Sequence, residues 1–196
     1  GISEADPAAR EAAYQRQTTI GFVVFTLCNI LFSLPAGLLS DRMSKRSVIL
    51  LLKGVEVLLM GSGALMLWFN PAGGILLLGI LGLMGAHSAL FSPAKYGILP
   101  EILPHEKLSH GNGLLQLWTF AAIIAGTCAG GALRDLTAAQ PWWAGAFLAL
   151  LAAAGWAAAF EVPRVPIARK EGNLSQTLRI GWEAIRTDRA LYLAVL

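Results

Sequence analysis

The sequence has little charge for its length. Only 14% of its 196 residues are Asp, Glu, Lys or Arg, whereas 56% are hydrophobic. Soluble domains carry about 25% charged residues, so this composition excludes an ordinary water-soluble fold and indicates a lipid bilayer as the solvent. The net charge of +3 is small, and the cations are scattered at the ends of apolar runs. This distribution gives no nucleic-acid footprint, and no nucleic-acid partner is expected.

Cysteine and the common motifs of cofactor binding are also scarce. The two cysteines, Cys28 and Cys128, lie inside apolar runs without metal-ligand spacing. They are predicted to be small packing residues, and no metal site is expected. No glycine-rich phosphate loop occurs, and no cofactor is expected.

Long apolar runs are what the chain has in abundance. The run 18–39 contains no charge, and at about 1.5 Å per residue its length is enough to cross a bilayer once. Four more spans are predicted over 47–69, 74–91, 114–133 and 142–160. We expect Pro93 to end the third of these spans and Asn112 to cap the start of the fourth. The predicted fold class is all-α, in a polytopic membrane protein.

Polar segments flank the five spans. Residues 1–17 are predicted to be a polar lead-in, in which Pro7 opens a short helix. Residues 161–189 are predicted to be a central cytoplasmic loop with an amphipathic helix, which lies either on the membrane surface or on the protein's own face. Another span would start in 190–196. Because the sequence begins without Met and stops inside an apolar run, we expect a piece of a longer protein.

The cations also predict an orientation. Eleven Lys and Arg lie at one set of helix ends, against three at the other. Cytoplasmic loops carry the excess of Lys and Arg in membrane proteins, so the end with eleven is predicted to be cytoplasmic.

A short charged turn joins the first two spans. Gly37, which would let another backbone approach closely, is followed by Asp41 and Arg42 and then by Lys45 and Arg46. This turn resembles the loop between the second and third helices of the major facilitator superfamily, although a serine replaces the second glycine of that pattern. The resemblance implies helices two to six of a transporter and the start of helix seven. Asp41 and Arg42 would then latch the two halves together, or form a charge cluster that only sets topology.

A second, narrower resemblance covers residues 92–101, Ser-Pro-Ala-Lys-Tyr-Gly-Ile-Leu-Pro-Glu, with 107–108 and 111–114. These residues resemble the bacterial lysophospholipid transporters, including those fused to a glycerophospholipid acyltransferase and an acyl-carrier-protein synthetase. The resemblance implies movement of lysophospholipid across the bacterial inner membrane for reacylation. Membrane lipid, a missing C-terminal transporter half and a fused or associated acyltransferase are the implied partners. Transport of another small molecule or drug by a member of the superfamily is the alternative.

The chain itself is not expected to be an enzyme. Acyltransferase chemistry, as in the fused relatives, needs a His and an Asp five residues apart as base and orienting group. None of His87, His105 and His110 has an Asp at that spacing. Catalytic domains of a fused parent would therefore lie beyond Leu196.

Polar residues around the third span are candidates for a substrate or coupling site. Lys95 and Tyr96 are predicted to lie at headgroup depth, where they could meet a phosphate or merely anchor the helix. His87 is either a hydrogen-bonded packing residue or a proton carrier. Glu101 and Asn112 belong to the same set of candidates.

Two charges lie inside the second span. Lys53 and Glu56 are three residues apart and so share one helix face, where they can neutralise each other. Because a lone charge in the bilayer centre costs about 2.5 to 3.5 kcal/mol, a lipid-facing, unpaired Glu56 is not expected. The pair is either purely structural or a coupling site in which Glu56 faces a cavity.

Small residues mark the fourth span. Gly126, Gly130 and Gly131 have the spacing that lets membrane helices pack closely, and we predict a packing role for them. The antiporter motif of the superfamily is also rich in glycine on this helix, but it carries a proline that this stretch lacks. Antiport is therefore not supported.

Overall fold

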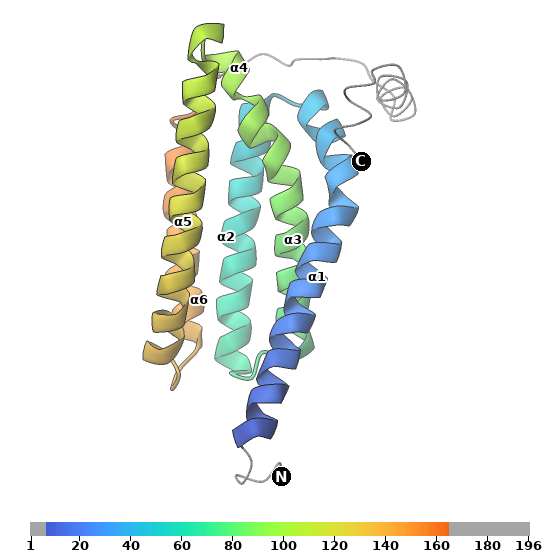
Figure 1. Cartoon of the computed structure of the whole chain (residues 1–196), viewed down its shortest axis with the longest axis vertical. Helices are drawn as coiled ribbons and strands as arrows, with labels where there is room; N and C mark the ends of the chain where they lie inside the picture. The colour runs from blue at the N-terminus through green and yellow to red at the C-terminus, as the bar shows by residue number, and fades with distance from the viewer. Residues whose placement is uncertain (1–6, 165–196) are drawn as a thin grey trace.

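The chain folds into long helices that run side by side (Figure 1). The computed structural model describes residues 7–164. The elements are α1 (Pro7–Arg42), α2 (Lys45–Phe69), α3 (Gly74–Gly97), α4 (Leu99–Ile102), the 3-10 turn η1 (His105–Lys107), α5 (Leu108–Leu136) and α6 (Trp142–Ala159). Five candidate spans are long and apolar enough to cross a membrane, and no strand occurs among the described residues. These observations confirm the predicted all-α membrane fold. The predicted amphipathic helix and the span after residue 189 lie outside the described residues.

Two predicted helix boundaries differ from the structure. α1 begins at Pro7, so residues 7–17 of the expected lead-in are helical and continue directly into the first span instead of forming a separate short helix. The expectation that Pro93 ends the third span is wrong, because α3 runs through this residue to Gly97. Proline is tolerated inside membrane helices where neighbouring helices and local adjustments compensate for the lost hydrogen bond.

The start of the fourth span is also earlier than predicted. Asn112 is not a helix cap, because α5 begins at Leu108 and Lys107 occupies the cap position. The turn before the helix explains this. Pro104, with φ fixed near the helical value, leads into η1, and η1 passes directly into α5. Gly111 lies against the side chain of Leu103, so the first turn of α5 is also held by the end of α4.

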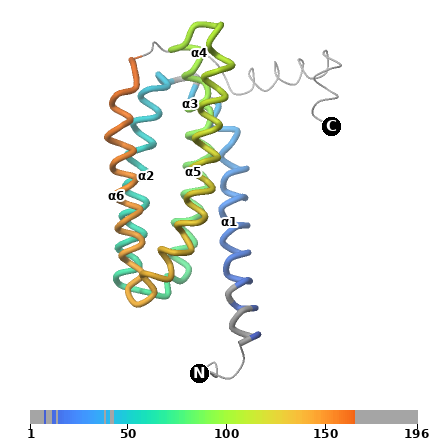
Figure 2. The backbone as a smooth tube through the Cα atoms, turned by 60° about the vertical axis from the view of Figure 1, so that its left-hand side comes forward, coloured from blue at the N-terminus to red at the C-terminus, as the bar shows by residue number. Residues whose placement is uncertain are grey.

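Two pairs of closely packed helices build the molecule. α1 packs on α3 and α2 packs on α6, while α2 and α3 join the two pairs (Figures 1 and 2). Glycines make the close approach possible: a Cβ on Gly85 of α3 would collide with the carbonyl oxygen of Phe25 in α1. A Cβ on Gly145 of α6 would lie 2.6 Å from the Cα of Ala64 in α2. Small residues at such contacts are what lets membrane helices pack.

α5 stands apart from the two pairs. None of its residues is buried, and its main contacts with the described elements are to α4 and η1 at one end. A Cβ on Gly126, Gly130 or Gly131 would meet nothing within 4 Å. The packing role predicted for these glycines is therefore not met by any described element, and Cys128 on the same helix is exposed rather than packed.

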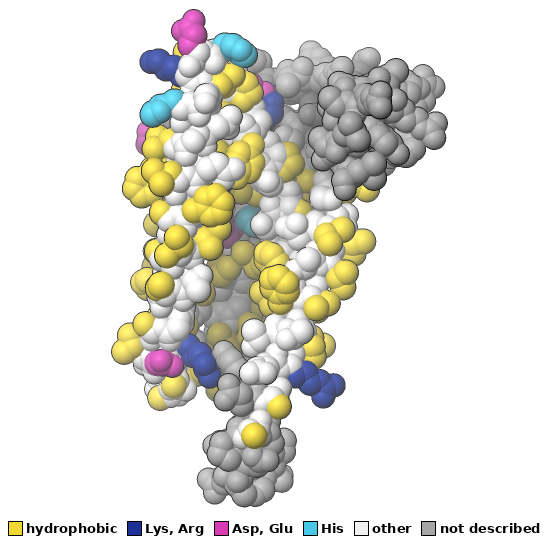
Figure 3. All heavy atoms as spheres, in the orientation of Figure 1, with side chains coloured by type: hydrophobic (Ala, Val, Ile, Leu, Met, Phe, Trp, Pro, Cys, Tyr) yellow, Lys and Arg dark blue, Asp and Glu magenta, His cyan; other side chains and the backbone are white. Residues whose placement is uncertain are grey.

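The two ends of the helices carry the turns. The α1–α2 turn, α4 and the end of α6 lie at one end, called here the motif end, and the α2–α3 and α5–α6 turns lie at the other (Figure 1). In the α2–α3 turn, Gly73 and Gly74 adopt φ of 74° and 60°, a left-handed conformation that suits glycine. Hydrophobic side chains cover the length of the molecule between the ends, whereas charged ones gather mostly at the ends (Figure 3).

Candidate functional site

The first turn of α2 connects three elements at the motif end. The side chain of Ser44 caps α2 by accepting a hydrogen bond from the amide of Ser47. Lys45 then forms an ion pair with Glu101 of α4, and the aliphatic part of the lysine side chain lies against Gly97. Both charged side chains are largely buried, and the second carboxylate oxygen of Glu101 has no partner among the described residues.

Arg46 makes a separate connection from the same turn. Its Nε donates to the carbonyl oxygen of Val162 at 2.6 Å, and its Nη2 donates to that of Phe160 at 3.2 Å. The last carbonyls of a helix lack partners within the helix, so the guanidinium caps the end of α6. Lys45 and Arg46 thus tie α2 to α4 and to α6 within this part of the chain.

The remaining predicted gate residues are placed less tightly. Asp41 and Arg42 form the last turn of α1, and only their backbone is described. The close backbone approach expected at Gly37 is absent among the described residues, because a Cβ there would meet nothing within 4 Å. A glycine at this position is therefore not required by any contact that the structure describes.

A polar cluster occupies the interface between α2 and α3. The Nζ of Lys53 lies 2.7 Å from Oε2 of Glu56, which confirms that these two residues pair on one helix face. The ammonium also lies over the ring of Phe91, 5.3 Å from its centroid. His87 of α3 is buried, and its Nε2 is 2.9 Å from the carbonyl oxygen of Leu52, as expected of a hydrogen-bonded packing residue.

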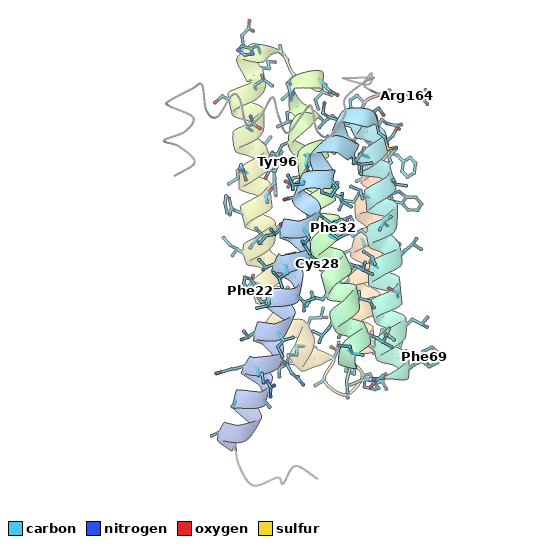
Figure 4. The ribbon with its side chains drawn as sticks, turned by 90° about the vertical axis from the view of Figure 1, so that its right-hand side faces the viewer. Phe22, Cys28, Phe32, Phe69, Tyr96 and Arg164 are labelled. Carbon is cyan, nitrogen blue, oxygen red and sulfur yellow. The ribbon has the colours of Figure 1, made fainter. Side chains whose placement is uncertain are left out.

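A second polar group joins the end of α3 to α5. The Nζ of Lys95 donates to the hydroxyl of Thr119 at 2.8 Å, and that hydroxyl donates to its own helix at Leu115. Next to it, the hydroxyl of Tyr96 lies 3.4 Å from Oε1 of Gln116. Figure 4 shows Tyr96 on the side of α3 that faces α5. We call Lys95, Tyr96, Gln116 and Thr119 the α3–α5 polar group.

Sequence reasoning did not find Thr119 and Gln116. The pattern that could have found them is helical: Asn112, Gln116 and Thr119 recur at spacings of four and three, which places them on one face of α5. Asn112 is exposed on this face, and the hydrogen bonds of the described residues that join α3 to α5 run from Lys95 and Tyr96 to Thr119 and Gln116 and do not include it. It therefore lies one turn beyond the group rather than in it.

The charges inside the spans do not balance. Glu56 neutralises Lys53, but Lys95 pairs with no carboxylate among the described residues. A positive charge in excess within an apolar surrounding favours an anionic ligand, because charges there are costly unless paired.

An apolar cavity lies toward the other end of the molecule. It has a volume of about 780 Å³ and is formed by α1, α2, α3 and α6. Its lining includes Phe22, Met60, Leu78, Met84 and Leu148. Met84 is eleven residues before Lys95, or roughly 16 Å along a helix that rises 1.5 Å per residue. The apolar cavity and the ammonium of Lys95 therefore lie at different levels along α3.

Comparisons with known proteins give one consistent result. The family model described as Major Facilitator Superfamily matches residues 11–196. The protein named lysophospholipid transporter LplT from Escherichia fergusonii is 39% identical over 147 residues, which cover 75% of this chain and 34% of that protein. The LplT of Klebsiella pneumoniae is 37% identical over 150 residues, which cover 75% of this chain and 34% of its own length.

A third relative agrees with the first two. The LplT of Citrobacter koseri is 41% identical over 113 residues, which cover 58% of this chain and 26% of that protein. The chain thus spans about a third of the length of the curated relatives that it matches. No solved structure matches the chain significantly.

Proposed function

The chain belongs to the Major Facilitator Superfamily, and from this premise we propose that it is part of a transporter that moves lysophospholipid across the bacterial inner membrane. The name shared by the similar proteins supports this substrate class. The observation in the structure that carries the proposal is the ammonium of Lys95. It lies within a span, donates a hydrogen bond to the hydroxyl of Thr119, lies over the ring of Tyr96, and pairs with no carboxylate among the described residues. A lipid phosphate is the anion that a bilayer supplies to such a group.

The apolar cavity supports a ligand with one acyl chain. A lipid whose phosphate meets Lys95 near the motif end would direct its chain along α3 toward the cavity. Since the motif end is predicted to be cytoplasmic, this is the orientation of a lipid in the cytoplasmic leaflet. A volume near 780 Å³ is within the range of sites that hold small ligands.

The proposal extends to parts outside this chain. The transporter would be completed by a C-terminal half, which forms the other wall of the substrate path, and the protein would supply lysophospholipid to an acyltransferase for reacylation. This acyltransferase is either fused to the transporter or a separate enzyme. The chain itself contributes transport and no catalytic residue.

Lipid translocation in vesicles tests the proposal. Full-length protein should move lysophosphatidylethanolamine between leaflets faster than protein-free vesicles do, as measured by extraction of the outer-leaflet lipid with albumin. Lys95→Ala should slow this rate roughly ten- to a hundredfold, because a hydrogen bond to a charged group contributes about 1.5–3 kcal/mol. Lys95→Arg should keep much of the rate.

Lys107→Ala is the matched control, because it removes the same charge from an exposed lysine on η1, which is not part of the α3–α5 polar group. If lysolipid moves no faster than in protein-free vesicles while the protein takes up a water-soluble solute, the proposed lipid substrate is wrong and the protein transports another small molecule. Equal rates for Lys95→Ala and the unchanged protein would remove Lys95 from the headgroup site.

A further inference from the structure

Tyr96 and Gln116 leave hydrogen-bonding capacity unused beside Lys95. The contact between the tyrosine hydroxyl and Oε1 of Gln116 is 3.4 Å, which is long for an O–H···O bond. The amide nitrogen of Gln116 donates no hydrogen bond within the described part of the chain, and its side chain is exposed. Both residues lie within candidate membrane spans, where polar groups without partners are costly. A small hydroxyl placed between them would use this capacity.

The spacing within the α3–α5 polar group fits a glycerol phosphate. Thr119, which shares a hydrogen bond with Lys95, is three residues after Gln116 on α5, so the two side chains are neighbours about 4.5 Å apart along the axis. Tyr96 directly follows Lys95 on α3. In a lysophospholipid whose chain is on the first glycerol carbon, the phosphate and the free hydroxyl are on adjacent carbons. A phosphate at Lys95 would therefore bring the hydroxyl next to Tyr96 and Gln116.

We propose that Tyr96 and Gln116 form a subsite for the free glycerol hydroxyl of a lysophospholipid. This inference rests on the proposed function and adds the reason why a single-chain lipid is selected. The hydroxyl accepts a hydrogen bond from the amide of Gln116 and donates one to the phenol oxygen of Tyr96. In a diacyl lipid the same oxygen is part of an ester, which has no hydrogen to donate and carries a second chain. The protein would thus select a single-chain lipid in two ways: by recognising the free hydroxyl, and by a path too small for a second chain.

A single-chain lipid that lacks the hydroxyl separates recognition of the hydroxyl from the effect of the number of acyl chains. The probes are lysophosphatidylethanolamine and its 2-deoxy analogue with the same chain, each tested with full-length protein in vesicles. The unchanged protein should move the deoxy lipid roughly five- to tenfold more slowly, the factor that corresponds to one hydrogen bond. In Gln116→Leu the rates of the two lipids should become equal, and Tyr96→Phe should lower their ratio partway.

Thr127→Val is the matched control on the same helix, because within residues 7–164 the hydroxyl of Thr127 bonds only to the carbonyl of Ile123 in its own helix. Its ratio of rates should equal that of the unchanged protein. Equal rates for both lipids with the unchanged protein would overturn the subsite while leaving lysolipid transport in place. A Gln116→Leu variant that keeps the full ratio would also overturn it. If neither lipid moves faster than in protein-free vesicles, the proposed function fails and the subsite fails with it.

Discussion

Lys53 and Glu56 show how individual charges are accommodated inside a span. Each side chain is about a fifth to a quarter exposed, and the two lie 2.7 Å apart. An unpaired charge at the bilayer centre costs about 2.5–3.5 kcal/mol, so the ion pair removes most of the penalty that either residue would impose alone. The ring of Phe91 further covers the ammonium.

This pairing predicts that neutralising one of the two charges destabilises the protein more than neutralising both. Glu56→Gln leaves the ammonium of Lys53 without a counter-charge, so we expect a loss of about 1–3 kcal/mol in stability, less than for a fully buried pair. The double variant Lys53→Met with Glu56→Gln should recover part of that loss. Thermal unfolding in detergent, followed by circular dichroism, measures both changes.

The control for this pair is Glu106→Gln, which neutralises an exposed carboxylate on η1 and should leave the midpoint of unfolding unchanged. A double variant less stable than Glu56→Gln alone would show that the pair contributes more than mutual neutralisation. The role of Glu56 in coupling, like the gate role of Asp41 and Arg42, stays a prediction.

Among the elements, the contact between α1 and α3 depends on the absence of a side chain. The carbonyl oxygen of Phe25 lies too close to the position of a Gly85 Cβ to leave room for that atom, and Asn29 donates from Nδ2 to the carbonyl oxygen of Gly85 at 3.2 Å. Gly82, one turn earlier, is close to the side chains of Val24 and Cys28. The two helices therefore approach each other closely at the face of α3 that carries Gly82 and Gly85.

A matched pair of glycines on α3 tests this contact. Gly85→Ala should force α1 away from α3 and lower stability by about 1–3 kcal/mol, as overpacking does in other cores. Gly79→Ala adds the same methyl group where nothing lies within 4 Å, so it should leave stability unchanged or slightly raised. Unfolding in an SDS titration measures the difference. Equal midpoints for the two variants would contradict the close contact.

α5 shows that a membrane helix does not need packing in order to be a helix. It has no buried residue, yet it is continuous over Leu108–Leu136. An α-helix pairs its backbone N–H and C=O groups within its own segment. Lipid offers these groups no other partner, so the helical conformation is stable there without packing against a neighbour. Along most of its length α5 packs against no other described element. Its side-chain hydrogen bonds to other described helices are therefore those with Lys95 and Tyr96 at the end of α3.

For the whole molecule, the distribution of charge predicts the orientation in the membrane. Among the described Lys and Arg, Arg42, Lys45, Arg46, Lys95, Lys107 and Arg164 lie toward the motif end, against Arg10, Arg16 and Arg134 toward the other end, so the motif end should face the cytoplasm. With Cys28 and Cys128 replaced by serine, single cysteines at Lys107 and Ala138 should react with an impermeant maleimide from opposite sides. Both positions are exposed, and they lie at opposite ends of α5.

The expected result is labelling of Ala138→Cys in intact spheroplasts and of Lys107→Cys only in inverted vesicles. Labelling both cysteines in intact spheroplasts, or the reverse assignment, would overturn the topology. A lysed sample provides the control, because both cysteines should then react fully.

The sequence by itself determined the helices and the pairing within one helix. Uncharged runs of span length leave the backbone in lipid no alternative to a helix, and the three-residue spacing of Lys53 and Glu56 is sufficient to bring them together. Boundaries were harder to predict: Pro93 lies inside α3 and Asn112 inside α5, because proline in a membrane helix is tolerated and a preceding turn started α5 early.

Only the tertiary structure decided which distant residues meet. The bonds from Arg46 to Phe160, from Lys95 to Thr119 and from His87 to Leu52 connect different helices. Each depends on how far the helices are rotated about their axes and how closely they approach. Contacts such as that of Gly85 with Phe25 determine this approach, and the periodicity of one helix contains no information about the rotation of its neighbour.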